Sequence, residues 1–232
     1  MGGQERREAI VKAVEDSTSA LADLFEREAT RFFTENDLVC CFHRLVHDAL
    51  AGLGAATVPD SDGRPHALVH CEYPTPFRSD MGRRRFAVRT DDERTPGGGK
   101  YRRGRFDVAV LNPSFVGGHP YATIKGQNYA AFRSAVLTGL AEADPIVLYG
   151  VEFVFCRDEI KPSRGGEWEK AANQFVAGVR QDAAKLTAAV ATAGYMHRAT
   201  LLAFVKGTTG KVMESIRSGL DGLPSVRLTT AQ

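Results

Sequence analysis

The chain has no long apolar run: nowhere in its 232 residues do eighteen or more apolar residues follow one another. This absence excludes a membrane-spanning helix, which needs about 20 such residues. The first thirty residues are rich in Glu, Arg and Asp, so they also lack the apolar segment of a signal peptide. We therefore expect a cytoplasmic protein that has no membrane partner.

Cysteine is also scarce, and its spacing is not that of a metal site. The four cysteines are Cys40, Cys41, Cys71 and Cys156. They form none of the CxxC pairs that gather zinc ligands, so we expect reduced and mostly buried thiols. His43 and His47 lie four residues apart, as in zinc enzymes, but the glutamate of an HExxH motif is missing. No zinc site is therefore predicted.

The chain lacks a strong excess of charge of either sign. Its 30 Lys and Arg residues face 28 Asp and Glu residues, a formal net charge of +2. Such a balance does not by itself indicate nucleic-acid binding, so that function has to rest on local charge. The length and the 43% hydrophobic content suffice for one substantial core. We predict one domain over residues 34 to 232, preceded by a helical arm over residues 1 to 33.

Two helices are expected at the start of the chain. Residues 4 to 30 have an apolar stripe at helical spacing, broken at Ser17, Thr18 and Ser19, which suggests an arm that docks a partner protein or a second copy of the chain. The second helix begins with Thr34 and Asp37, which resemble a capping box with Asp in place of Glu or Gln. Glu35 therefore lies at the start of its buried face.

The rest of the chain reads as strands flanked by helices, which predicts an α/β fold with a mixed central sheet. Two of the strands carry an acid within apolar sequence: Asp107 alternates with Phe106 and Val108, and Glu152 with Val151 and Phe153. The expected strands are 67–73, stopped by two prolines, 106–111, 145–155, 199–205 and 226–229, and the expected helices are 128–140, 167–193 and 211–220.

In this order of elements, Glu35, Asp107 and Glu152 resemble the acids of the PD-(D/E)xK, or restriction-endonuclease-like, superfamily. That fold has an αβββαβ core, an Asp near the start of its second strand, a (D/E)xK motif on the third and often a Glu on the first helix. The resemblance covers about residues 34 to 206. It implies that Asp107 and Glu152 bind Mg²⁺ or Mn²⁺ together, that Glu35 is a supporting acid, and that the chain is a deoxyribonuclease.

The sequence departs from the superfamily at the motif lysine, where it has Val154. Some members are similar in having moved this basic group onto the following helix. Lys170 is the position that we expect to replace it, and Lys161 and Arg157 are weaker alternatives. A metal ion lowers the pKa of its bound water most, so the loss of the lysine would impair such a site without necessarily abolishing its activity.

Two other functions stay open at this point. The domain would be catalytically silent, and bind nucleic acid or a partner protein in a larger assembly, if Val154 marks a dead site. It would be an unrelated α/β binding protein if the acids only line a solvated cleft.

Residues 78 to 105 hold a local basic excess, with ten basic residues against four acidic ones, and the tract Pro96-Gly97-Gly98-Gly99. We expect a long hairpin or loop that leads directly into the strand of Asp107. Guanidinium groups suit phosphate geometry, so the stretch would hold nucleic acid, DNA rather than RNA, without reading its sequence. The arginines predicted to bind it are Arg83, Arg84, Arg85, Arg102, Arg103 and Arg105.

Overall fold

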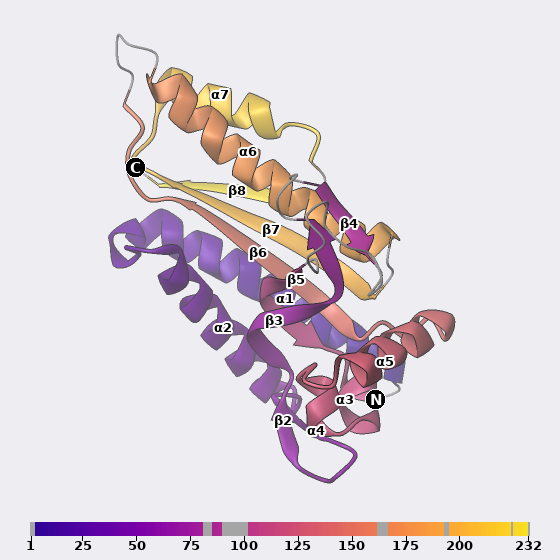
Figure 1. The fold of residues 1–232 in the computed structure, drawn as a ribbon. Coiled ribbons are helices and arrows are strands. Elements are labelled where there is room, and N and C mark those ends of the chain that lie inside the picture. Colours follow the sequence, from indigo (N-terminus) through magenta and orange to yellow (C-terminus); the bar gives the residue numbers. More distant parts are fainter. Residues whose placement is uncertain are drawn as a thin grey trace.

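The computed structural model describes residues 3–80, 85–89, 102–161, 167–192, 195–223 and 225–231. Its centre is a six-stranded sheet in the order β4-β3-β5-β6-β7-β8 (Figure 1). The strands are β3 (Val69–Asp80), β4 (Arg85–Arg89), β5 (Arg102–Leu111), β6 (Val147–Cys156), β7 (Met196–Lys206) and β8 (Val226–Ala231), with β1 (Thr57–Pro59) and β2 (Pro65–Ala67) as a separate antiparallel pair. Neighbouring strands from β4 to β6 are antiparallel, and β6, β7 and β8 are parallel.

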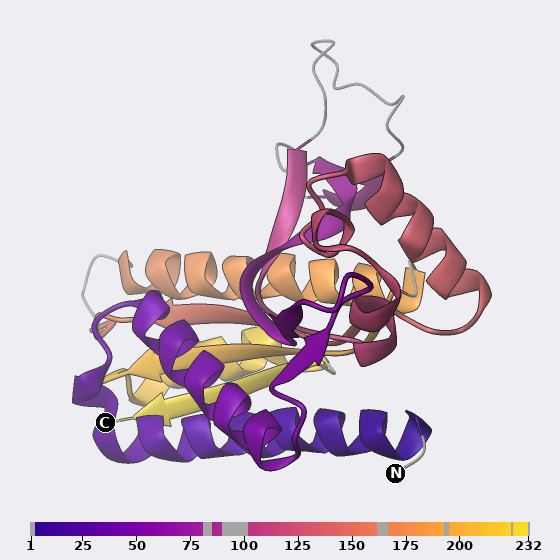
Figure 2. The ribbon, with the colours of Figure 1, turned by 90° about the horizontal axis from the view of Figure 1, so that it is seen from below.

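Helices cover both faces of this mixed sheet, as the α/β prediction requires. Figure 1 and Figure 2 show α1 and α2 on one face and α6 with α7 on the other. The helices are α1 (Gly3–Glu28), η1 (Ala29–Arg31), α2 (Glu35–Gly52), α3 (Pro113–Gly118), α4 (Tyr121–Ile124), α5 (Tyr129–Ala141), α6 (Glu167–Thr187), the π-helical turn η3 (Ala188–Thr192) and α7 (Gly210–Leu220). None of the helices in the described part of the chain is both long and apolar enough to cross a membrane.

Helix α1 is built into the core of the domain. Ile10, Leu21 and Phe25 are completely buried, and the ring centroid of Phe25 lies 4.8 Å from that of Phe204 on β7. The polar interruption of the stripe is accommodated within the helix, because the Ser17 hydroxyl donates to the carbonyl oxygen of Ala13 at 2.7 Å. The apolar face that we expected to dock a partner is thus taken up by the chain's own sheet.

Helix α2 begins as its sequence predicts. The amide of Asp37 donates to Oγ1 of Thr34 at 3.3 Å, and the amide of Thr34 donates to the Asp37 carboxylate at 2.8 Å, which completes the capping box. The apolar side chains Leu38 and Phe42 are fully buried against the sheet, and each such burial contributes about 1.5–3 kcal/mol. The cap and this face together fix Glu35 in the first turn of the helix.

Strand β3 is longer than its sequence predicts. Pro74 and Pro76 do not end it: Pro74 still pairs with Arg105 of β5, and the strand continues to Asp80. Instead, the register between β3 and β5 shifts between Pro74 and Arg78. Proline has no amide hydrogen to donate to the neighbouring strand, which accounts for this irregularity. The pairing with β5 on one side and β4 on the other sustains the strand beyond them.

Strand β6 is the central strand that its apolar sequence predicts. It lies between the antiparallel β5 and the parallel β7, and seven consecutive residues from Val147 to Phe153 are buried. Phe153 packs on Phe42 of α2, with ring centroids 5.5 Å apart. Because side chains alternate along a strand, Glu152 is directed to the opposite face, which α6 covers.

Candidate active site

Strands β5 and β6 separate at the two predicted acids. Their ladder runs from Leu111 with Val147 to Val108 with Val151, and Asp107 and Glu152 occupy the next positions on the two strands. The amide of Phe153 donates to the carboxylate of Asp107 at 2.7 Å, where a continuing β5 would have supplied a backbone partner. Asp107 therefore lies in the gap between the strands, next to Glu152.

Glu35 reaches the same edge of β6 from the start of α2. Its carboxylate accepts a hydrogen bond from the amide of Phe155 at 3.2 Å. Two carboxylates from different elements, Asp107 and Glu35, thus satisfy alternate amides of β6 beyond the point where β5 departs. The structure brings all three predicted acids to one place.

The cation at this cluster is Lys185, from the second half of α6. Its ammonium forms an ion pair with Oε1 of Glu152, a residue that is only 3% exposed. The Lys185 side chain is itself 10% exposed, and its Nζ lies 5.4 Å from the centroid of the Phe106 ring. Asp182 stands three residues before Lys185 on the same side of the helix.

The electrostatics of the cluster are dominated by burial and by an excess of acids. Burial raises the pKa of Glu152 well above its ordinary value; Lys185 opposes this shift and Asp107 adds to it. Burial is also the largest cause that raises the pKa of Asp107, Asp182 and Glu35, and the charge of Asp107 contributes at the last two. Lys185 lowers the pKa of three of these acids, Glu152, Asp107 and Asp182, and burial outweighs its effect at each of them.

A fifth acid borders the cluster on β3. Glu72 has a φ of 53°, the left-handed region that side chains other than glycine rarely occupy. Its carboxylate lies 3.4 Å from the guanidinium of Arg105, and its charge is one of the causes that raise the pKa of Asp107. Strained backbone of this kind costs about 1–3 kcal/mol and is concentrated at functional sites.

Two hollows flank these acids. One of about 440 Å³ is lined by Glu72 and Arg105 together with residues of α4. The other, of about 570 Å³, is lined by Glu35 and Phe155 and by residues of α6. Each hollow thus reaches one acid at the border of the cluster, Glu72 or Glu35, and neither is lined by Asp107 or Glu152.

The structure places Lys185, and not Lys170, against Glu152. Lys170 is exposed in the first turn of α6, fifteen residues and about 22 Å along the helix axis from Lys185. The alternatives Lys161 and Arg157 are exposed and pair with nearby acids. Sequence reasoning missed Lys185 because it searched the start of the helix, whereas α6 runs back along β6 and its later turns lie over Glu152. The sequence does contain one signal for Lys185: Asp182 lies three residues before it, so the two charged side chains share one side of the helix.

The arginine-rich stretch lies partly outside the described residues. Arg83 and Arg84 belong to that part, and the side chains of Arg85 on β4 and of Arg102 and Arg103 on β5 are not described either. Arg105 is exposed and pairs with Glu72. Strand β4 itself is the predicted hairpin strand, and it packs against α6 and η3 (Figure 1).

Within the described part of the chain, no group of three or more His, Cys, Asp or Glu side chains is placed to hold a metal ion, and this includes the acids around Glu152. The four cysteines are free, but the prediction that most are buried is wrong: Cys40 and Cys71 are exposed, and the other two are partly exposed.

The raised pKa of Glu152 predicts a specific dependence of stability on pH. The folded state retains a proton that the unfolded state releases near the ordinary value of 4.5, so the free energy of unfolding falls as pH rises above that value. We expect Glu152→Gln, measured by urea unfolding without divalent metal between pH 4.5 and 8, to flatten this fall. Glu167→Gln, at an exposed position of α6, is the matched control, and equal slopes in the two variants would contradict the prediction.

Comparisons of the chain with protein-family models, with curated proteins and with solved structures gave no match.

Proposed function

We propose that this chain is a metal-dependent nuclease that hydrolyses phosphodiester bonds in DNA. The observation that carries the proposal is the meeting of Glu35, Asp107 and Glu152 with the buried Lys185 where β5 and β6 separate. The succession of α2, β3, β5, β6, α6 and β7 also accords with the αβββαβ core of the restriction-endonuclease-like superfamily. In this proposal Lys185 on α6 takes the role of the motif lysine, whose position on β6 is occupied by Val154.

The residues present suit a hard divalent cation. Oε1 of Glu152 is fully buried and accepts no hydrogen bond of good geometry within the described residues, and Lys185 only partly offsets the negative charge around it. Asp107 and Glu152 would hold the ion; Mg²⁺ commonly takes one or two carboxylates and keeps several waters, so a third protein ligand is not required. A bound ion would activate water and neutralise charge on the phosphate.

The chain's own groups have separable tasks in this proposal. Lys185 opposes the rise in the pKa of Glu152 and offers an ammonium to a phosphate oxygen or a water. Glu35 and Asp107 keep the edge of β6 open by satisfying its amides in the absence of β5. The arginines between residues 83 and 105 would hold the phosphate backbone in this proposal.

Metal binding tests this proposal independently of cleavage. Because the pKa values of the acids are raised, we expect Mg²⁺ to displace protons from the cluster, and calorimetry in two buffers of different ionisation enthalpy measures that release. Nicking of supercoiled plasmid with Mg²⁺ or Mn²⁺ is the accompanying activity assay. Saturable Mg²⁺ binding with proton release and nicking by the same preparation would support the proposal, and Asp107→Asn should remove both.

A silent domain is the second candidate, and one observation favours it. The cluster already has internal partners: Lys185 forms an ion pair with Glu152, and backbone amides occupy one oxygen each of Asp107 and Glu35. Such acids would have a purely structural role. The same calorimetry separates the two functions, because a silent cluster releases no protons on addition of Mg²⁺ or Mn²⁺ and leaves plasmid DNA intact.

A further inference from the structure

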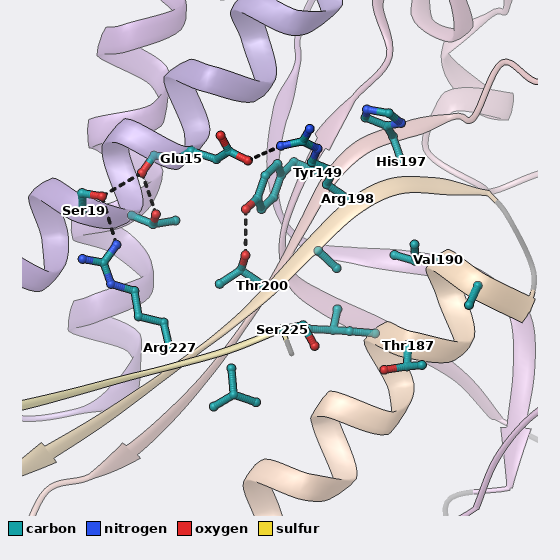
Figure 3. A pocket seen from close by; sticks show the side chains of 15 residues that line it. Glu15, Ser19, Tyr149, Thr187, Val190, His197, Arg198, Thr200, Ser225 and Arg227 are labelled. Atoms are coloured by element: carbon teal, nitrogen blue, oxygen red, sulfur yellow. Dashed lines mark hydrogen bonds and ion pairs between the residues drawn. The ribbon is translucent and has the colours of Figure 1, made fainter. Parts of the chain in front are cut away.

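A cavity of about 620 Å³ lies away from the acidic cluster, between α1, the first half of β7 and the end of α6 with η3 (Figure 3). It exists because β8 is shorter than β7: Val226 pairs with Leu201, so residues 196–200 have no strand beside them on that side in the described part of the chain. Helices α1 and α6 form the two walls of the opening. Its volume is in the range of small-molecule sites.

The floor of the cavity includes backbone of β7. The amide of Leu201 donates to the carbonyl oxygen of Ser225 at 2.8 Å, which is the last bond on this side before the strand becomes uncovered. In a parallel sheet, backbone groups alternate between the two neighbouring strands, so the backbone of Ala199 faces the cavity that it lines. A donor and an acceptor are thus directed into the opening.

The polar wall carries one more positive charge than negative. Figure 3 shows the guanidinium groups of Arg198 and Arg227 directed toward α1. Arg198 pairs with Glu15 at 2.5 Å, whereas Arg227 donates only to the hydroxyl of Ser19, at 3.0 Å, and forms no ion pair within the described residues. Arg227 therefore has guanidinium capacity left for an anion at the cavity.

The opposite wall is apolar. Leu186 and Val190 line it from α6 and η3, and Val226 lines it from the start of β8. The wall is shaped by η3, a π-helical turn, and turns of this kind occur frequently at functional sites. One cavity thus offers a cationic side, backbone of β7 and an apolar side.

We propose that this cavity binds a small organic anion, a carboxylate or a phosphomonoester that carries an apolar body. The anionic group would engage Arg227, and the body would lie against Val190 and Val226, which are both partly exposed. This inference does not rest on the proposed nuclease function, because none of these residues belongs to the acidic cluster.

Fluorescence titration with anilinonaphthalene sulfonate, an aromatic anion, tests the proposal on the full chain. We expect saturable binding by the parent and about tenfold weaker binding by Arg227→Gln, because a charge-assisted hydrogen bond is lost. Ala191→Trp, at an exposed position of η3 that lines the cavity, should obstruct the probe without removing a charge. Arg217→Gln on α7, outside the cavity, is the matched control for charge and should bind like the parent.

Competition then identifies the anionic group. Displacement of the probe by octanoate assigns a carboxylate, and displacement by phenyl phosphate assigns a phosphomonoester; inorganic phosphate, which has no apolar body, should displace it least. The proposal is overturned if the parent shows no saturable binding, if Arg227→Gln and Arg217→Gln bind alike while circular dichroism shows both folded, or if neither organic anion competes.

Discussion

Lys185→Met should lower the free energy of unfolding by about 3–5 kcal/mol at pH 8. The variant keeps the volume and the apolar stem of the lysine but leaves the carboxylate of Glu152 buried without its cation. The loss should shrink as pH falls toward 5, because Glu152, whose pKa burial already raises, then takes up a proton and becomes neutral. Urea unfolding at the two pH values measures the difference.

Two further variants make this expectation specific to the ion pair. The double variant Glu152→Gln with Lys185→Met removes both charges, so it should recover most of the stability lost at pH 8. Lys170→Met, at an exposed position of the same helix, should change stability by no more than about 0.5 kcal/mol. Equal destabilisation by Lys170→Met and Lys185→Met would show that the buried pair is not the cause.

Lys185→Gln should also reduce Mg²⁺-dependent cleavage of plasmid DNA by about 10²- to 10³-fold if the proposed function holds. The reason is positional: Lys185 is the cation that the fold brings to Glu152, whereas Lys170 lies about four turns away along α6. Lys170→Gln is therefore expected to cleave at the parent's rate. Initial rates are compared at a temperature at which circular dichroism shows every variant to be folded.

A rescue experiment separates the chemical role of Lys185 from a structural one. Val154 lies two residues after Glu152 on the same face of β6, so the exchange Val154→Lys returns an amine to the acid's side of the strand. In the Lys185→Gln background this exchange should restore part of the cleavage. If Lys170→Gln loses cleavage and Lys185→Gln keeps full activity, the amine belongs to Lys170 and the proposed role of Lys185 is refuted.

The sequence alone determined which acids stand on which elements. Local rules suffice for that: the capping box of Thr34 and Asp37 starts α2 and places Glu35 in its first turn, and alternation along apolar strands separates Asp107 and Glu152 from their apolar neighbours. The order of elements followed from the same patterns. Both kinds of signal depend on residues within a few positions of one another, and for this reason they can be read without the fold.

Only the tertiary structure decided what faces these acids. The end of the β5–β6 ladder at Val108 and the return of α6 over β6 bring Lys185 to Glu152, and neither is encoded by spacing within one segment. Pairing with its neighbours also lets β3 continue beyond its two prolines. The apolar face of α1 packs against the sheet, which buries that face in the core. Contacts between distant segments outweigh local preference here, because burial of apolar surface and pairing of backbone groups are satisfied by the whole sheet rather than by any one strand.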